Sequence, residues 1–351
     1  IKINKIMIIN HLTIILISSF SAFLLTFLLS PFFIQFLIKN KFAKNLRDTD
    51  STWRIATIFN KLHKEKKWTP TMWWILIWWV VLIIILFSRL LSYFWYIDSS
   101  LLDRWEIYLP LFTLIFMWFL GAIDDYLNII QSKHKWLHHN PKLFFILLFA
   151  LIWGLWFYFK LWYTSIYIPF LWDLNIWILY IPFFIFLVTW TANAVNITDW
   201  LDWLATWLLI SAFFAFWILA YFKWLYNLSI FCAIIVWTLA AFLWNNIPPA
   251  KFYMWDTWSL ALWATLWVIW MMIDKVFVLP IIWWIFLFEI ISVIIQLTSK
   301  KLRNWKKIFK IAPFHHHLEA IWWTESQIVM RFWIIWAFLS FIGILIWMIN
   351  I

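Results

Sequence analysis

Long apolar stretches dominate this chain and leave it few ways to fold. About ten stretches are nearly free of charge, and most have the roughly 20 residues that a helix needs to cross a bilayer. They lie near residues 12–38, 71–94, 106–122, 142–159, 176–192, 203–222, 228–244, 258–273, 277–298 and 329–349. The sequence therefore predicts an all-α integral membrane protein of about ten transmembrane helices, in one domain covering residues 1–351.

Composition supports this fold class. Hydrophobic residues make up 66% of the chain and charged residues 12%, whereas soluble domains are roughly half apolar and about a quarter charged. The first stretch is too long for a cleavable signal peptide and is predicted to be a signal anchor. The single cysteine, Cys232, lies in an apolar stretch, which excludes a disulfide framework. The ninth stretch carries Glu289 and Gln296, so it is expected to be bent or to line a cavity; plain hydrogen bonds between helices are the alternative.

The distribution of basic residues predicts the orientation in the membrane. Alternate loops fall into two sets, of which one holds nineteen Lys and Arg residues and the other six. Cytoplasmic loops carry the excess of basic residues in membrane proteins. The basic set is therefore expected to be cytoplasmic, with both termini on the extracytoplasmic side. These loops also account for the net charge of +11, so no nucleic-acid partner is expected.

Five polar segments interrupt the apolar background, and all of them fall on the basic, cytoplasmic side. They are residues 66–72, 122–126, 193–202, 253–259 and 313–317. Three of these segments are rich in Asp, and adjacent carboxylates repel one another unless a cation lies between them. Ligation by oxygen alone favours magnesium or manganese, and magnesium commonly bridges a carboxylate to a phosphate. The pattern predicts one divalent-cation site, although any single loop Asp is also explained as a helix cap.

The fifth segment contains three consecutive histidines, His315 to His317. Neighbouring helical residues point about 100° apart, so three in a row rarely bind one zinc ion together. Contact with a phosphate or a sugar is the better functional interpretation, and a solvated loop is the alternative. Lys66, Lys67 and Lys142 are candidate phosphate partners. Attraction to anionic lipid explains these lysines equally well.

At these segments the chain resembles the phospho-N-acetylmuramoyl-pentapeptide transferases, within the superfamily of polyprenyl-phosphate N-acetylhexosamine-1-phosphate transferases. That family has TPTMGG, DDY, NAVNLTDGLDGLA, FMGDTGS and APLHHHFE followed by GW. This chain reads TPTMWW, DDY, NAVNITDWLDWLA, YMWDTWS and APFHHHLEAIWW, in the same order. The resemblance extends from about residue 39 to the C-terminus. The triple histidine and the TPTM segment separate this branch from the N-acetylglucosamine-phosphate branch.

The resemblance implies a reaction. Undecaprenyl phosphate attacks the β-phosphate of UDP-N-acetylmuramoyl-pentapeptide, UMP leaves, and the first lipid-linked precursor of peptidoglycan synthesis forms. It further implies an Mg²⁺ cofactor, a multi-pass protein of the bacterial inner membrane with its active site facing the cytoplasm, and a homodimer. A site at the cytoplasmic ends of helices suits this chemistry, because a lipid phosphate must meet a water-soluble nucleotide there. Phosphoryl transfer depends on charge neutralisation and in-line positioning.

By this resemblance Asp256 is expected to bind the magnesium ion, and Asp124 to act on the lipid phosphate as a base or orienting group, with Asp125 beside it. The other residues expected to be catalytic are Asp199, Asp202, Lys66, His315, His316 and His317. The residues expected to bind substrate are Thr71, Lys142, Asn193, Asn196, Asn246, Tyr253 and Gln296. Within that second set, Asn246 and Tyr253 match positions that contact uracil.

Tryptophan stands in this chain where the family has glycine. The chain has 36 Trp and 3 Gly, although glycine is normally about 7% of residues. Within the motifs, family glycines are replaced at Trp68, Trp73, Trp74, Trp200, Trp203, Trp255, Trp258 and Trp322, whereas Trp323 matches a family tryptophan. Glycine allows positive φ and close approach to phosphate in such loops. Our hypothesis is that most of these positions are UGA codons read as glycine in the cell; a protein adapted to Trp is the alternative.

Two other functions remain open at this point. A related transferase could use UDP-N-acetylglucosamine in place of the muramoyl-pentapeptide substrate. A transporter could use the charged ninth stretch as a path. Transporters often show paired halves with broken helices, and the sequence has no such internal repeat.

Overall fold

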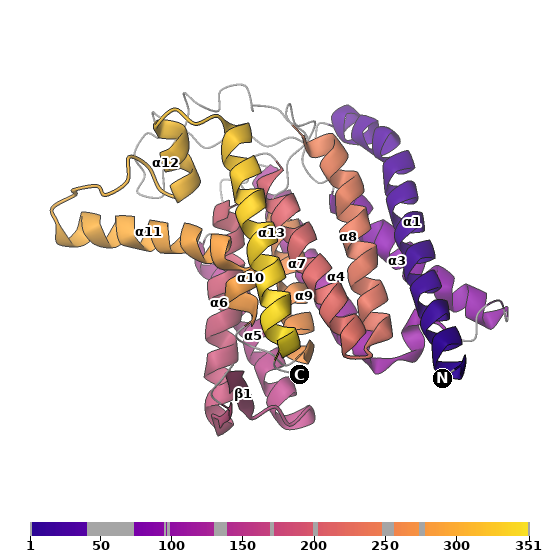
Figure 1. The fold of residues 1–351 in the computed structure, drawn as a ribbon. Helices are drawn as coiled ribbons and strands as arrows, with labels where there is room; N and C mark the ends of the chain where they lie inside the picture. The colour runs from indigo at the N-terminus through magenta and orange to yellow at the C-terminus, as the bar shows by residue number, and fades with distance from the viewer. Residues whose placement is uncertain are drawn as a thin grey trace.

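The computed structural model describes residues 2–40, 74–94, 96, 99–129, 139–168, 172–198, 203–247, 256–273 and 278–349. Its helices are α1 (Lys2–Lys39), α3 (Trp74–Tyr93), α4 (Trp105–Ile129), α5 (His139–Lys160), α6 (Tyr180–Thr198), α7 (Leu204–Phe222), α8 (Tyr226–Asn246), α9 (Asp256–Ile273), α10 (Val278–Ile282), α11 (Trp284–Leu302), α12 (Phe314–Ala320) and α13 (Glu325–Ile349). Two short 3₁₀ helices cover Leu101–Asp103 and Trp177–Leu179. Most of these helices run side by side as a bundle (Figure 1).

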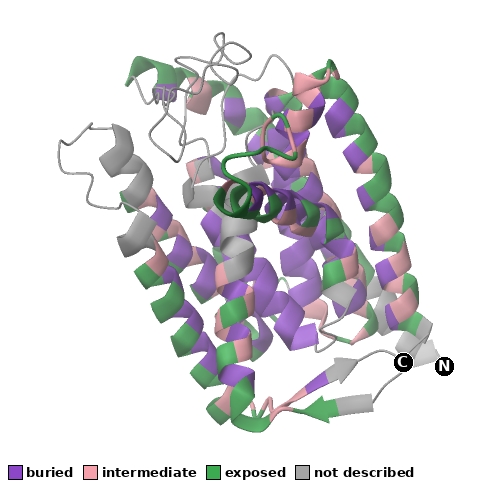
Figure 2. Cartoon of the chain, turned by 90° about the vertical axis from the view of Figure 1, so that its left-hand side faces the viewer, coloured by how far each residue is buried: buried purple, intermediate pink, exposed green. Residues whose placement is uncertain are grey.

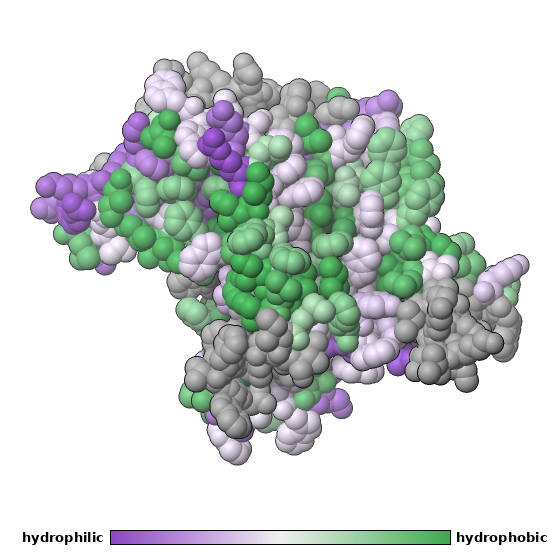
Figure 3. All heavy atoms as spheres, viewed as in Figure 1, coloured by the Kyte–Doolittle hydropathy of each residue, from purple (hydrophilic) through white to green (hydrophobic). Residues whose placement is uncertain are grey.

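The described helices confirm an all-α membrane protein. Seven of them contain segments long and apolar enough to cross a bilayer, and these lie in α1, α3, α4, α5, α7, α8 and α13. Their outer faces remain apolar: Leu16, Phe20 and Phe32 of α1 are each more than half exposed. Figure 3 shows hydrophobic side chains covering the middle of one face, as expected for a surface that contacts lipid.

The core lies around α7, α8 and α9. Phe213, Phe231 and Trp263, one from each of these helices, are fully buried. α1 packs along α8, and α4 packs along α9, so two outer helices cover the central ones. Figure 2 shows the buried residues concentrated in the middle of the bundle and the exposed residues on its outer helices. Burial on all sides requires helices that are apolar around their whole circumference, as these sequences are.

The ninth expected span is two helices that differ in direction. A turn at Trp283 separates α10 from α11, and α11 lies across the bundle axis with its C-terminal end projecting outward (Figure 1). The expected bend is therefore present, at a turn six residues before Glu289, and the alternative expectation of a hydrogen bond to another helix also holds for Glu289, which contacts His315 of α12. The last turn of α11 contains Lys300 and Lys301.

One small sheet was not predicted from the sequence. Strands β1 (Ser165–Ile168) and β2 (Trp172–Asn175) pair antiparallel, with Ser165 opposite Asn175. The hairpin connects α5 to α6 at the end of the bundle where α1 begins and α13 ends (Figure 1). Phe157 of α5 contacts Phe184 of α6 at a ring-centroid distance of 5.4 Å. The hairpin therefore reverses the chain, so that α5 and α6 run antiparallel.

Left-handed backbone conformations occur almost only at tryptophan. Of the seven described non-glycine residues with positive φ, one is Asn304. The other six are Trp162, Trp177, Trp203, Trp224, Trp305 and Trp322. This conformation costs an L-residue about 1–2 kcal/mol, and for a bulky residue it is an outlier. Six such residues would cost about 6–12 kcal/mol, which is comparable with the whole net stability of a typical domain at about 5–15 kcal/mol.

Candidate functional site

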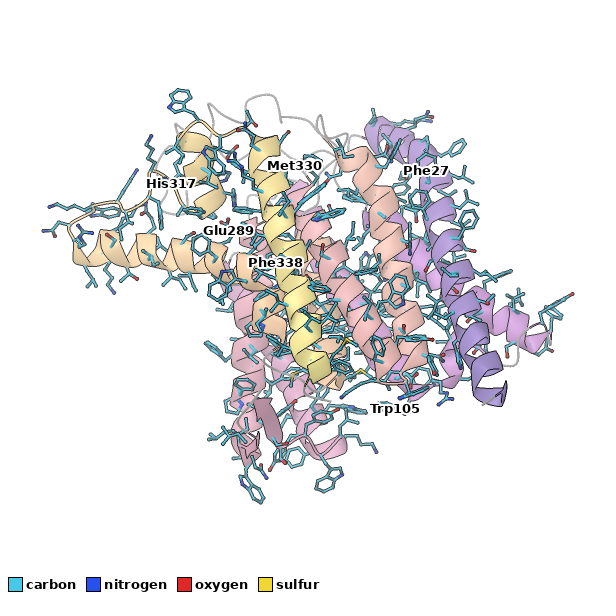
Figure 4. All side chains as sticks on the ribbon, in the orientation of Figure 1. Phe27, Trp105, Glu289, His317, Met330 and Phe338 are labelled. Atoms are coloured by element: carbon cyan, nitrogen blue, oxygen red, sulfur yellow. The ribbon has the colours of Figure 1, made fainter. Side chains whose placement is uncertain are left out.

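Two of the Asp-bearing helix ends lie at the same end of the bundle. Trp118 of α4 lines a small apolar cavity together with Ala261 and Leu262 of α9. From these contacts the chain continues six residues forward to Asp124 and six residues back to Asp256, a rise of about 9 Å along each helix. The helices pack along each other. Phe112 contacts Trp153 and Phe116 contacts Phe149, so α4 is antiparallel to α5. Since α5 and α9 are both antiparallel to α6, α4 and α9 are antiparallel, and the end of α4 meets the start of α9. Figure 4 shows Trp105, where α4 begins, at the opposite end of the bundle from His317.

The start of α5 and the end of α6 lie at this same end of the bundle. The Tyr180 hydroxyl at the start of α6 lies 3.9 Å from Sδ of Met271 near the end of α9. α6 therefore runs antiparallel to α9, and Asn193 and Asn196 in its last turns are at the end where α9 begins. Since α5 is antiparallel to α6, the first turn of α5, with Lys142, belongs to this end as well. For these residues, as for Asp124, Asp125 and Asp256, the structure places the backbone only.

Asn246 joins this end of the bundle to the start of α7. Its side chain is buried, and its Oδ1 accepts hydrogen bonds from the backbone N–H of Trp203 at 2.9 Å and from Oγ1 of Thr206 at 3.3 Å. Trp203 is the residue directly before α7 and has φ 60°. Asn246 thus holds the turn that follows the NAVNITD segment. A contact with uracil remains a prediction for this residue.

The best-defined polar contact in the region is the pair formed by Glu289 of α11 and His315 of α12. The His315 ring Nδ1 lies 3.1 Å from Glu289 Oε2, and the His315 backbone N–H donates to the same oxygen at 3.4 Å. Both side chains are completely buried. A buried charge is costly unless it is paired and hydrogen-bonded, so this pairing fixes α12 against α11.

The other two histidines have different partners. His316 Nδ1 lies 2.5 Å from Oε2 of Glu319 in the same helix. His317 Nδ1 accepts the backbone N–H of Lys310 at 3.2 Å. The three rings therefore engage three different groups. Among the residues whose side chains the structure describes, no cluster of three His, Cys, Asp or Glu could hold a metal.

Gln296 forms hydrogen bonds with the backbone of the segment that precedes the three histidines. Its Oε1 accepts the backbone N–H groups of Ile308 and Phe309, each at 3.0 Å, and its Nε2 donates to the Phe309 carbonyl at 2.8 Å. The side chain is 4% exposed. The described contacts of Gln296 are thus all with the chain itself, and its predicted contact with substrate stays a prediction.

Five predicted site residues lie outside the described part of the chain. They are Lys66, Thr71, Asp199, Asp202 and Tyr253. In the sequence, Asp199 and Asp202 fall between the end of α6 and the start of α7.

Sequence reasoning missed the partners of the histidines. The pairing of His316 with Glu319 could have been found from their spacing of three residues in a helix. The pairing of His315 with Glu289 had no local signal, since 26 residues separate the two.

Comparison with known proteins identifies the class of protein that this fold and site define. The model of glycosyl transferase family 4 matches residues 107–274, and the relatives below, which match most of the chain, define the class more closely. A phospho-N-acetylmuramoyl-pentapeptide-transferase of Clostridium novyi is 36% identical over 340 residues, covering 95% of this chain and 97% of the relative. The enzyme of the same name from Staphylococcus saprophyticus is 34% identical, with 92% and 96% covered. That from Listeria innocua is 32% identical, with 91% and 94% covered. The chain belongs to the phospho-N-acetylmuramoyl-pentapeptide-transferase family.

Proposed function

We propose that this protein transfers phospho-N-acetylmuramoyl-pentapeptide from its UDP carrier to undecaprenyl phosphate. An oxygen of the lipid phosphate bonds to the β-phosphorus, the bond from that phosphorus to the bridging oxygen breaks, and UMP leaves. The observation that carries the proposal is the similarity to enzymes of this name over 95% of the chain. It gains support from the packing, which gathers the motif-bearing ends of α4, α6, α7 and α9 at one end of the bundle.

The proposed roles follow from chemistry and position. Asp124 and Asp125 orient the lipid phosphate, with Asp124 as the candidate base, and Asp256 is a ligand of magnesium. Carboxylate oxygens are the ligands that this ion prefers, and helices that end together suit a shared ion. When bound, Mg²⁺ supplies charge neutralisation at the diphosphate. The protein's own contribution is to hold the two phosphates in line.

The remaining candidates bind the parts of the substrates that do not react. Lys66, Lys142 and the three histidines are proposed to contact phosphate and sugar oxygens. The proposed nucleotide and peptide contacts are Thr71, Asn193, Asn196, Asp199, Asp202, Asn246, Tyr253 and Gln296.

The proposal includes an orientation in the membrane. Ten spans with both termini extracytoplasmic put the motif-bearing end in the cytoplasm, where UDP-sugars are made. The excess of basic residues in the loops at that end supports this orientation. α1 begins and α13 ends together at the opposite end (Figure 1), which suits an even number of crossings. A homodimer is proposed from the family resemblance.

Measuring UMP release tests the function. The full chain, with glycine at the eight motif positions where the family has it, is assayed in detergent with undecaprenyl phosphate and Mg²⁺. We expect release from UDP-N-acetylmuramoyl-pentapeptide, and none above background when the lipid phosphate is omitted. Release from UDP-N-acetylglucosamine alone would favour the related transferase. No release from either nucleotide would contradict the enzymatic function and return the transporter to consideration.

A further inference from the structure

We propose that Glu289 is a positioning residue for His315 in the transfer reaction, an inference that rests on the proposed function. Glu289 lies on α11 and His315 on α12, at the upper end of the bundle in Figure 4, where Glu289 and His317 are labelled. The Glu289 Oε2 atom faces both the ring Nδ1 at 3.1 Å and the backbone N–H at 3.4 Å of His315. Two contacts to one residue fix both its position and the rotation of its ring.

The pairing leaves one ring atom for a ligand. His315 Nε2 is buried, and no partner for it is present among the described residues. Buried polar atoms almost always have a partner, so an orphaned Nε2 points to a group that is absent from the protein alone. On a protonated ring Nε2–H is a donor that suits a phosphate oxygen. We therefore infer that His315 contacts a substrate phosphate and that Glu289 orients the His315 ring toward it.

A purely structural role is the competing explanation, because the same pair also fixes α12 to α11. The two explanations differ in what happens once the His315 ring is gone. A positioning residue acts on catalysis only through that ring. A residue with a purely structural role changes kcat/KM whether the His315 ring is present or not.

A double-mutant cycle measured on kcat/KM for UMP release separates them. Glu289→Gln keeps an acceptor oxygen without the charge, and Glu289→Leu removes both. We expect kcat/KM to fall about 10-fold for Glu289→Gln and about 100-fold for Glu289→Leu. In a His315→Gln background, neither change should lower kcat/KM further. Equal losses with and without the His315 ring would overturn the proposal.

Glu106→Gln is the matched control. Glu106 is also a nearly buried glutamate, 5% exposed, and its Oε1 accepts the backbone N–H of Asn227 at 3.3 Å. It lies in the first turn of α4, at the end of the bundle away from the site. Glu106→Gln keeps the acceptor oxygen for Asn227 and should leave kcat/KM unchanged. All these variants are made in the chain with glycine at the eight motif positions. Activity of that chain without further changes establishes the enzyme itself, so a failure of the Glu289 proposal is distinguishable from a failure of the function.

We infer, independently, that the six left-handed tryptophan positions are glycines in the functional protein. These are positions 162, 177, 203, 224, 305 and 322. Glycine is the residue that adopts positive φ without a steric penalty. Four of the six lie outside every motif that the family resemblance used, so the backbone alone points to them: Trp162, Trp177, Trp224 and Trp305.

Two of these positions have the hydrogen bonds of a glycine-terminated helix. After α7, Trp224 N–H donates to the Tyr221 carbonyl at 3.1 Å and Leu225 N–H to the Ala220 carbonyl at 3.0 Å. After α12, the N–H groups of residues 322 and 323 make the same pair of bonds, to Glu319 at 3.0 Å and Leu318 at 3.1 Å. This pattern is the Schellman motif, whose left-handed residue is usually glycine. Trp224 and Trp322 occupy that residue.

The indole groups at three of the six positions are mostly exposed, so their burial contributes little to offset the strain. Trp322 is 91% exposed, Trp162 80% and Trp224 68%. Trp323, the next residue in the chain, behaves differently: the Arg331 guanidinium lies 3.9 Å from its ring centroid, a distance at which a cation is attracted to the ring. The structure therefore assigns glycine at 322 and a true tryptophan at 323.

One tryptic peptide tests both assignments. Residues 311–331 follow Lys310, end at Arg331 and contain no other Lys or Arg, so the fragment carries positions 322 and 323 together. Fragmentation mass spectrometry of this peptide from the native protein is expected to give glycine at 322 and tryptophan at 323. Tryptophan at 322, or glycine at 323, would overturn the inference.

A stability comparison tests the backbone argument without native material. Trp224→Gly should raise the midpoint of thermal unfolding, because it removes the left-handed strain, and Trp224→Ala should not. Trp237 is the control: it is 40% exposed and lies in the middle of the helix α8. Trp237→Gly should lower the midpoint, since glycine destabilises a helix interior. A lower midpoint for Trp224→Gly would contradict the strain argument.

Discussion

Asp256→Ala is expected to abolish UMP release, with kcat/KM falling by at least about 10³-fold. Asp256 is the first residue of α9, at the helix end that meets the Asp-bearing end of α4. Phosphoryl transfer depends on neutralising the charge of the phosphates, and loss of a magnesium ligand removes part of that neutralisation. Chelation of Mg²⁺ should abolish the activity of the chain with glycine at the eight motif positions, in which Asp256→Ala is also made.

The control for this prediction is Asp103→Asn. Asp103 is an aspartate near the start of α4, at the other end of the bundle, and its Oδ1 lies 2.6 Å from Nη1 of Arg89. Exposed ion pairs contribute little to stability, so Asp103→Asn should leave UMP release unchanged. Magnesium-dependent release that survives Asp256→Ala at the unmutated rate would rule out the assigned role of Asp256.

The second large effect is expected from glycine at the eight motif positions. A chain with tryptophan there should release no UMP above background, and a chain with glycine there should be active. The described part of the site shows why. The backbone of Trp203 has a left-handed conformation. Its ring centroid lies 4.9 Å from that of Trp333, and the rings of Trp207 and Trp333 stack with their centroids 4.1 Å apart. Indoles therefore fill the space beside the turn that Asn246 holds, whereas glycine allows a backbone to approach phosphate closely.

Restoring Trp203 alone to the glycine-bearing chain sharpens this comparison. We expect activity to fall again, because the turn before α7 would regain both the strain and the bulk. Trp237→Gly, a change in the helix α8 away from the motifs, serves as the control and should not create activity in the tryptophan-bearing chain. Equal UMP release from the tryptophan-bearing and glycine-bearing chains would refute the glycine assignment at the motifs.

The class of protein followed from the sequence because membrane insertion depends on local composition. An apolar stretch of sufficient length needs no information about its neighbours to be recognised. The bend in the ninth stretch was likewise predicted from residues within it, Glu289 and Gln296. The magnesium-binding role of Asp256 was predicted from a motif of consecutive residues. The glycine positions within the motifs could also be found locally, since the residues on either side match the family.

Tertiary structure alone decided which distant groups meet. The pairing of Glu289 with His315 depends on how α11 crosses the bundle, and the contacts of Asn246 depend on how α8 packs against α7. Such contacts arise from packing between segments far apart in the chain, and no residue pattern specifies them. The left-handed conformations at Trp162, Trp177 and Trp224 were likewise invisible in the sequence, because φ is set by where a helix must end and the chain must turn.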